Sequence, residues 1–233
     1  MNNEAVELVI FDCDGVLVDS EIISANTLIE QLHSLGVDID FEYVQQYFLG
    51  CSFSFVVENI NKKFNVSLPG NFEEMYKQKL FEAFKNELQP IEGITDVLSH
   101  LSVDYCLASS SSLERIRFSL ENTSLTSWFA DKIFTAEQVE NGKPAPDLFL
   151  HAAQKMGYVP QKCLVIEDSS SGIQAALSAG MRVMHFIGGA HLKHKTRQVL
   201  AGEELNIPVI NEWSEFFDLR PDLYNTTNKS TRG

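Results

Sequence analysis

The 233-residue sequence predicts an α/β fold in which a doubly wound parallel sheet carries an inserted domain of α-helices. Three observations lead to this fold class. Short, nearly continuous apolar runs recur along the chain, and such runs are typical of strands buried on both faces. Helical patterns separate most of these runs, as they do in parallel sheets. One long stretch near the N-terminus is helical and contains no convincing strand.

The apolar runs are the expected strands. In chain order they are VELVIF (6–11), VDYCLA (103–108), DKIF (131–134), KCLVIE (162–167), RVMHFI (182–187) and IPVI (207–210). Helical patterns between them cover residues 113–122, 145–157 and 171–180. Gly157 and Gly180 end the last two of these patterns, at the position just beyond a helix where glycine is favoured.

Residues 20–88 break the alternation of strand and helix. Apolar residues recur there at helical spacing in four segments, which are 28–36, 41–48, 55–64 and 72–84. A simple crossover between strands needs only one helix. We therefore expect residues 20–88 to form a helical cap domain, inserted into an α/β core of residues 1–19 and 89–221. The polar residues 222–233 are expected to form a flexible tail.

Composition restricts the partners. The formal net charge is −14, which argues against nucleic acid but leaves room for a small anionic substrate in a local basic pocket. No apolar run approaches the roughly 20 residues that span a bilayer, and the N-terminus has no secretory pattern. The four cysteines are dispersed and form no C-x-x-C pair. We expect a cytoplasmic protein without a membrane partner, and a monomer by default.

The first candidate site is FDCDGVLVDSE, directly after the first expected strand. Asp12 and Asp14 are two residues apart, so both can project into one site, and Gly15 permits a sharp turn. Two carboxylates this close favour a bound cation between them. One can attack phosphorus as a nucleophile while the other acts as general acid and base. The alternative is an ordinary Asp-Gly turn with solvated acids.

Three further clusters follow later strands, and ligands of such sheets bind beyond the carboxyl ends of the strands. The hydroxyls of ASSSS (108–112), above all Ser109 and also Ser110, can hold a phosphoryl oxygen, although they can equally cap a helix. In NGKPAPD (141–147), Lys143 can neutralise phosphoryl charge or remain a solvated loop lysine.

The last cluster is IEDSSSG (166–172), in which Glu167 and Asp168 end an apolar strand. Unpaired carboxylates are costly there, and a metal ion explains them, although helix capping is the alternative. The four clusters occur in order, each at the end of a strand.

Together the clusters resemble the haloacid dehalogenase-like hydrolase superfamily, over roughly residues 8–190. The helical insert is similar to that family's C1-type cap, and the core to its Rossmann-like domain. The resemblance implies that Asp12 is the nucleophile and Asp14 the general acid and base. It further implies that Ser109 binds the phosphoryl group and Lys143 stabilises its charge.

The same resemblance implies Mg2+ as cofactor. Its ligands are Asp12, the main-chain carbonyl of Asp14, and Asp168, and Glu167 supports the ion through water. The strings DCDGVLVDSE, GKPAPDLF and EDSSSGIQAALSAGM are similar to the branch of β-phosphoglucomutases and sugar-phosphate phosphatases. The chain looks particularly like bacterial 6-phosphogluconate phosphatases. The implied partner is therefore a small phosphorylated metabolite, a sugar or sugar-acid phosphate.

Two departures from that branch favour a phosphatase over a mutase. Ser24 stands where the mutases usually carry a histidine, and the cap loop around Gly50 (48–53) lacks the basic residues that hold a second phosphate. A phosphosugar mutase stays the main alternative, and a non-catalytic binding protein on the same scaffold is a remote one. Asp14 argues against a dehalogenase or a phosphonate-cleaving enzyme.

Several further residues have two interpretations. Glu21 and Gly50 are candidate substrate-binding residues, but Glu21 also suits the first turn of a helix and Gly50 simple cap packing. Cys13 and His185 are expected in the core. The segment 188–195, GGAHLKHK, can reach an acidic substrate or simply begin a solvated helix.

Overall fold

The structure is a computed structural model that describes residues 5–48, 51–192 and 207–225. Its strands form one parallel sheet of six strands in the order β3-β2-β1-β4-β5-β6. The strands are β1 (Leu8–Phe11), β2 (Asp104–Ser109), β3 (Ile133–Thr135), β4 (Cys163–Glu167), β5 (Arg182–Phe186) and β6 (Val209–Ile210). This is the order of a doubly wound sheet, so the predicted fold class is confirmed, and each of the six expected strands is present.

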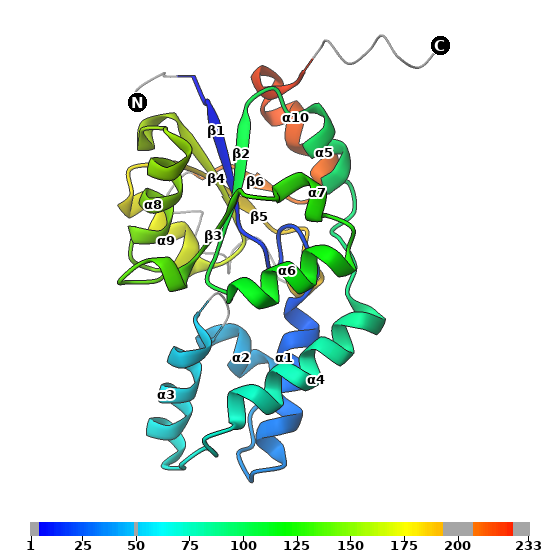
Figure 1. Cartoon of the computed structure of the whole chain (residues 1–233), viewed down its shortest axis with the longest axis vertical. Coiled ribbons are helices and arrows are strands. Elements are labelled where there is room, and N and C mark those ends of the chain that lie inside the picture. Colours follow the sequence, from blue (N-terminus) through cyan, green and yellow to red (C-terminus); the bar gives the residue numbers. More distant parts are fainter. Residues whose placement is uncertain (1–4, 49–50, 193–206, 226–233) are drawn as a thin grey trace.

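Helices cover both faces of the sheet (Figure 1). In the core they are α5 (Ile94–His100), α6 (Leu113–Asn122), α7 (Thr126–Phe129), α8 (Asp147–Met156), α9 (Ser170–Ser178) and α10 (Phe216–Leu219). In Figure 1, α8 and α9 lie on one side of the sheet and α5 and α10 on the other.

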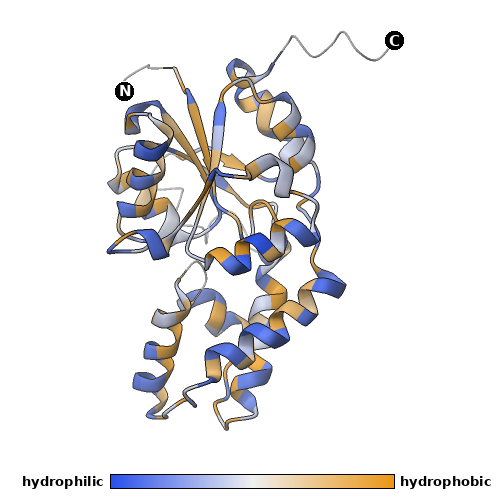
Figure 2. Ribbon diagram, in the orientation of Figure 1, coloured by the Kyte–Doolittle hydropathy of each residue, from blue (hydrophilic) through white to orange (hydrophobic). Residues whose placement is uncertain are grey.

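β1 shows why the sheet is buried on both faces. Val9 and Phe11 belong to one hydrophobic cluster, whereas Leu8 and Ile10 belong to a second one on the opposite face. Successive side chains of a strand point to opposite faces, so an unbroken apolar run fills both clusters. Figure 2 shows the result as hydrophobic strands at the centre, surrounded by helices with polar outer faces.

The cap consists of α1 (Glu21–His33), α2 (Phe41–Tyr47), α3 (Phe53–Phe64) and α4 (Phe72–Glu87). It lies below the sheet in Figure 1, with α6 of the core next to it. Several contacts join α4 to α6, among them a hydrogen bond from Asn122 Nδ2 to Phe84 O (2.7 Å). The rings of Phe81 and Phe118 stack with centroids 4.3 Å apart, and Lys77 forms an ion pair with Glu114.

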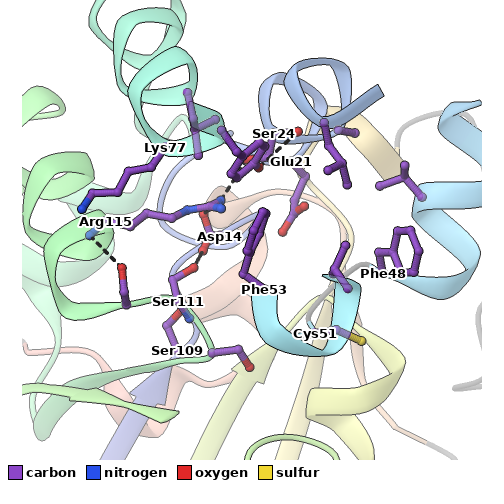
Figure 3. Close-up of a pocket in the computed structure, with 18 of the residues that line it drawn as sticks. Asp14, Glu21, Ser24, Phe48, Cys51, Phe53, Lys77, Ser109, Ser111 and Arg115 are labelled. Carbon is purple, nitrogen blue, oxygen red and sulfur yellow. Dashed lines mark hydrogen bonds and ion pairs between the residues drawn. The ribbon is translucent and has the colours of Figure 1, made fainter. Parts of the chain in front are cut away.

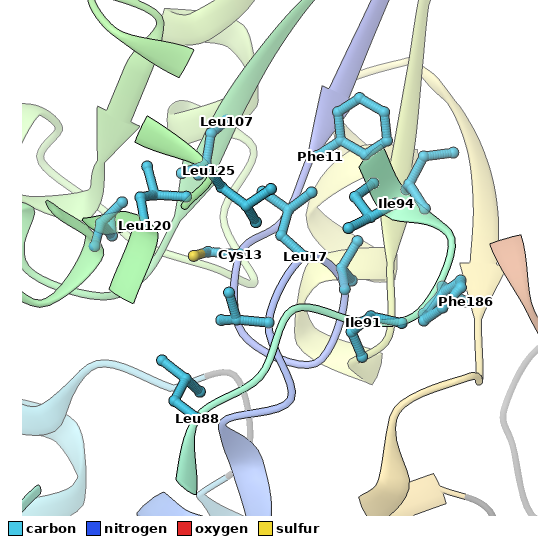
Figure 4. Close-up of a cluster of buried hydrophobic side chains, with 14 of the residues drawn as sticks. Phe11, Cys13, Leu17, Leu88, Ile91, Ile94, Leu107, Leu120, Leu125 and Phe186 are labelled. Atoms are coloured by element: carbon cyan, nitrogen blue, oxygen red, sulfur yellow. The ribbon is translucent and has the colours of Figure 1, made fainter. Parts of the chain in front are cut away.

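The chain crosses between core and cap twice, and the two crossings lie side by side. Asp19 N donates a hydrogen bond to Gln89 O (3.0 Å), and Val18 pairs with Pro90. Apolar side chains from both crossings, including Leu17, Leu88 and Ile91, pack in one buried cluster (Figure 4).

The C-terminal part of the described chain is more ordered than expected. We expected a flexible tail from residue 222, but Leu223 is buried and Tyr224 pairs with Leu101. Ser102 N also donates a hydrogen bond to Leu223 O (2.9 Å). The apolar side chain and these backbone contacts hold the chain to the core, so a tail does not begin at residue 222. None of the described helices combines the length and the apolar character that a membrane-spanning segment needs.

Candidate active site

The predicted site residues come together at the carboxyl ends of β1, β2 and β4, in a pocket between core and cap. Figure 3 shows part of this pocket. Its lining includes all four predicted catalytic residues, which are Asp12, Asp14, Ser109 and Lys143, as well as Glu21, Ser110 and Asp168. The sequence clusters therefore do meet, because the strands that carry them are neighbours in the sheet.

Asp12 follows β1 and lies against Lys143. Asp12 N donates a hydrogen bond to Ile166 O (3.0 Å), which ties the residue to β4. Lys143 Nζ lies 2.5 Å from Asp12 Oδ1 and 2.8 Å from Glu167 Oε1. Burial raises the pKa of Asp12 well above its usual value, because the charge of Lys143 offsets only part of the desolvation.

Lys143 is itself buried, so it is not a solvated loop lysine. Burial lowers the pKa of its ammonium, but the carboxylates of Asp12 and Glu167 outweigh this effect and hold the pKa above the usual value. Lys143 therefore stays charged beside the Asp12 carboxylate, where it can neutralise negative charge.

Asp14 has a different environment from Asp12. Its Oδ1 accepts hydrogen bonds from Ser20 Oγ (2.5 Å) and Arg115 Nη2 (2.7 Å), and its Oδ2 accepts one from Ser111 Oγ (2.6 Å). Burial raises the pKa of Asp14, but the charge of Arg115 and the hydrogen bonds outweigh it, so the net shift is downward. The two aspartates thus have pKa values moved in opposite directions.

Gly15 lets the chain turn between these two environments. Its φ of +74° is one that residues with a side chain rarely adopt. A Cβ at this position would also lie 1.9 Å from Asp168 Oδ2. The glycine is therefore required both for the turn and for the close approach of Asp168.

The serines at the end of β2 and directly after it have different hydrogen-bond partners. Ser112 caps α6 and accepts a hydrogen bond from Arg115 N (3.3 Å). Ser109 is buried, and its Oγ accepts a hydrogen bond from Ser111 N (3.1 Å). The buried Ser110 Oγ has no hydrogen-bond partner within the described residues, so it is available to a ligand. Helix capping thus explains only the last serine of the run.

Asp12, Glu167 and Asp168 form an acidic cluster. One oxygen of each lies within 4.8 Å of the others, and all three residues are buried. Both oxygens of Glu167 have partners, because Oε1 accepts from Lys143 and Oε2 from Ser169 N (2.6 Å) and Oγ (2.9 Å). Burial, and then the charge of Glu167, raise the pKa of Asp168 well above its usual value.

This cluster fits a hard divalent cation. Mg2+ prefers carboxylate oxygens, and here Lys143 offsets only part of the buried negative charge. The Asp14 carboxylate is not part of the cluster, since it is held by Ser20, Ser111 and Arg115.

Sequence reasoning missed residues that contact the carboxylates of the site, among them Ser20, Arg115 and His191. Arg115, on α6, pairs with Asp14 and donates a second hydrogen bond to Ser24 Oγ (2.9 Å). His191 Nε2 lies 3.0 Å from Asp168 Oδ2. The only available signal for Arg115 was its place in the first turn after the serine run, and His191 lay in a segment with two open interpretations.

The remaining candidates have mixed outcomes. Glu21 lies in the pocket, where burial and then the charge of Asp14 raise its pKa to about 8. Gly50 lies outside the described residues, and so does the end of the 188–195 segment. Cys13 and His185 are buried in the core, as predicted, and His185 Nε2 lies 3.1 Å from Asp168 O.

Comparison with known proteins agrees with this geometry. The family model described as haloacid dehalogenase-like hydrolase matches residues 9–186. A 6-phosphogluconate phosphatase of Escherichia coli is 31% identical over 81% of this chain and 86% of its own length. A probable pseudouridine-5'-phosphatase of Drosophila melanogaster is 34% identical over 75% of this chain and 79% of its own length.

A solved structure shows the same fold. A conserved haloacid dehalogenase-like protein of Agrobacterium tumefaciens superposes with a TM-score of 0.77 and 32% identity, covering 94% of this chain and 99% of its own. The order of the motifs, the sheet and the relatives agree. The chain belongs to the haloacid dehalogenase-like hydrolases and is a phosphoric monoester hydrolase.

Proposed function

We propose that the protein is a Mg2+-dependent phosphatase of a small sugar or sugar-acid phosphate, with Asp12 as its nucleophile. One observation carries the proposal: two aspartates two residues apart have opposite environments in one pocket. Asp12 lies against Lys143 in the acidic cluster, whereas Asp14 accepts hydrogen bonds from Ser20, Ser111 and Arg115. The two carboxylates therefore have different partners, which allows them different catalytic roles.

In the first step, an Asp12 oxygen forms a bond to phosphorus while the bond from phosphorus to the ester oxygen breaks. The leaving oxygen takes a proton from Asp14, and Asp12 becomes an aspartyl-phosphate. The free site holds Asp14 ionised, so it must first gain a proton. An approaching phosphate favours this, because negative charge raises the pKa of a nearby carboxyl group.

In the second step, Asp14 takes a proton from water, whose oxygen attacks phosphorus. The bond between phosphorus and Asp12 breaks, which releases inorganic phosphate. Asp12 is again a free carboxylate, and Asp14 again carries the proton that it gave up in the first step. The hydrogen bonds to Asp14 keep its carboxylate ionised in the free site, and the ionised form is the one that can accept a proton in this step. Lys143 and the hydroxyls of Ser109 and Ser110 are placed to hold the phosphoryl oxygens.

We infer that Mg2+ is held by Asp12, the Asp14 main-chain carbonyl and Asp168. Glu167 already pairs with Lys143 and Ser169, so we assign it a supporting role, through water, rather than direct ligation. When bound, Mg2+ supplies charge neutralisation and orientation of the phosphoryl group.

Charge in the pocket favours a phosphatase over the alternative mutase. Among the described lining residues the lysines and arginines are Lys77, Arg115 and Lys143. Each already pairs with a carboxylate, of Glu114, Asp14 and Asp12 respectively. A bisphosphate would need further cations for its second phosphate, so water is the better final acceptor. Cytoplasmic location and a monomeric state stay predictions.

A screen for phosphate release across sugar phosphates and a generic aryl phosphate, with Mg2+ and with a chelator, tests the proposal. We expect release only with Mg2+, and we expect Asp12→Asn to abolish it while leaving the fold intact. Asp38→Asn is the matched control, because Asp38 is exposed on the cap. Near-native activity of Asp12→Asn would show that the nucleophile is misassigned. Isomerisation of β-glucose 1-phosphate, dependent on added bisphosphate and without phosphate release, would establish the mutase.

A further inference from the structure

Most of the side chains that the cap contributes to the pocket are apolar. The polar floor of the pocket comes from the core. The cap contributes side chains of α1, α2, α3 and α4, together with Phe48, which follows α2. We call the following set the apolar roof: Leu28, Val44, Phe48, Phe53, Val56 and Tyr76. In Figure 3, Phe48 and Phe53 lie on the cap side, with Phe48 opposite Arg115 across the pocket.

Two aromatic members of the apolar roof, Phe53 and Tyr76, pack against each other. The rings of Phe53 and Tyr76 are stacked, with centroids 4.7 Å apart and an angle of 21° between their planes. The hydroxyl of Tyr76 donates a hydrogen bond to Ser24 O (3.2 Å), so it is not free to bind substrate hydroxyls. The apolar roof therefore offers rings and methyl groups to a ligand.

Glu21 and Ser24 of α1 line the pocket beside the apolar roof, and Ser24 Oγ already donates to Ser20 O and accepts from Arg115 Nη2. Glu73 and Lys77 of α4 also line the pocket, and Lys77 already pairs with Glu114. The residues of the apolar roof offer no free hydrogen-bonding group, so hydroxyls of a polyol packed against them would lose water without compensation from the roof. A flat aromatic group would instead gain from burial and from stacking on the rings.

We propose that the leaving alcohol of the preferred substrate carries a flat aromatic or heterocyclic group that packs under the apolar roof, as the base of a nucleoside 5'-phosphate would. The inference rests on the proposed phosphatase function and narrows its substrate class to sugar phosphates with such a substituent. The ester oxygen lies at Asp12 and Asp14, and the planar group lies toward Phe53.

A matched pair of substrates tests the inference. Ribose 5-phosphate and uridine 5'-monophosphate are both esters of a primary ribose hydroxyl, so their leaving groups are chemically alike and only the base differs. We expect kcat/KM for phosphate release, with Mg2+ present, to be at least about 10-fold higher for the nucleotide, which corresponds to about 1.4 kcal/mol. 6-Phosphogluconate, a polyol acid, should also be the poorer substrate. Equal or higher kcat/KM for ribose 5-phosphate or 6-phosphogluconate would overturn the inference.

Variants connect the preference to the apolar roof. Phe53→Ala should lower kcat/KM for uridine 5'-monophosphate at least about 5-fold and change that for ribose 5-phosphate less than about 2-fold. Phe55→Ala is the control, because Phe55 lies on the same helix but is 45% exposed. Val56→Thr replaces a methyl group of the apolar roof by a hydroxyl of similar size. It should lower the ratio of kcat/KM for uridine 5'-monophosphate to kcat/KM for ribose 5-phosphate, and it provides the test if Phe53→Ala fails to fold.

The outcomes separate this inference from the proposed function. An equal loss for both substrates in Phe53→Ala, or an unchanged ratio in Val56→Thr, would contradict selection by the apolar roof while phosphatase activity stands. Absence of phosphate release from all three substrates and from an aryl phosphate would overturn the proposed function, and the inference with it.

Discussion

Gly172→Ala should impair the acidic cluster although alanine normally strengthens a helix. Gly172 lies in the first turn of α9, where an ideal Cβ would be 1.7 Å from Glu167 Oε1 and 2.0 Å from its Cδ. Glycine to alanine in a helix interior is otherwise favourable by up to about 1 kcal/mol. Real atoms do not approach this closely, so the Glu167 side chain must move.

The cost follows from the contacts that Glu167 loses. Its oxygens accept hydrogen bonds from Lys143 Nζ (2.8 Å) and from Ser169 N (2.6 Å) and Oγ (2.9 Å). Hydrogen bonds to charged groups contribute about 1.5–3 kcal/mol each, so losing two of them outweighs the helix preference. We expect a net decrease of about 2–5 kcal/mol in the free energy of unfolding. A displaced Lys143 should also reduce kcat at least about 100-fold.

Urea unfolding and phosphate release from an aryl phosphate, both with Mg2+, measure these effects. Gly70→Ala is the matched control, because no atom lies within 4 Å of its ideal Cβ. If Glu167 is the obstacle, Gly172→Ala should cost much less in a Glu167→Asp background, since contacting sites are not additive. Unchanged stability and activity of Gly172→Ala would refute the reasoning.

Three further predictions concern charge. The raised pKa values of Asp12 and Asp168 mean that the metal-free protein loses stability as pH rises through these values. Mg2+ should therefore raise Tm more at pH 8 than at pH 5. An equal rise of Tm at both pH values would argue against the acidic cluster as the metal site. Glu21 has a folded-state pKa of about 8, so its contribution is lost between about pH 4.5 and pH 8. Glu21→Gln should therefore exceed wild type in unfolding free energy at pH 9 by at least about 1 kcal/mol, and no gain in urea unfolding would contradict this. Lys143→Met should abolish phosphate release and lower the unfolding free energy by about 3–5 kcal/mol, because it leaves buried carboxylates unpaired; calorimetry that shows wild-type stability would count against the buried ion pairs.

The sheet could be predicted because its local signal is strong. In runs such as 162–167 the central residues Cys163 to Ile166 are all apolar, and such short apolar runs rich in β-branched residues are typical of buried strands. The site residues followed from the sheet, since Asp12 and Asp168 come directly after a strand and Ser109 is the last residue of one. Ends of elements were less accurate: α1 already begins at Glu21, seven residues before the expected segment at 28. Its first turn carries polar residues that face the pocket, so the apolar periodicity does not reveal it.

Arg115 could not be predicted, for a different reason. Its partner Asp14 is 101 residues away in the sequence, and no periodicity connects the two. The contact depends on how α6 is placed beside the first turn after β1, which is a property of the whole fold. The order at Leu223 is similar, because a single apolar residue in a polar segment finds its partners only in tertiary structure.

The register of β1 determines where the proposed nucleophile Asp12 lies, and so limits the substitutions in the sheet that the enzyme can accept. Phe11 is aligned with Leu107 of β2 and Ile166 of β4, so two neighbours fix the strand from both sides. A slip of one residue would move the chain by about 3.3 Å and exchange its two faces, bringing Cys13 to the place of the nucleophile. Substitutions that loosen the sheet should therefore reduce turnover before they reduce folding, because phosphoryl transfer depends on a position that the sheet, rather than the pocket, determines.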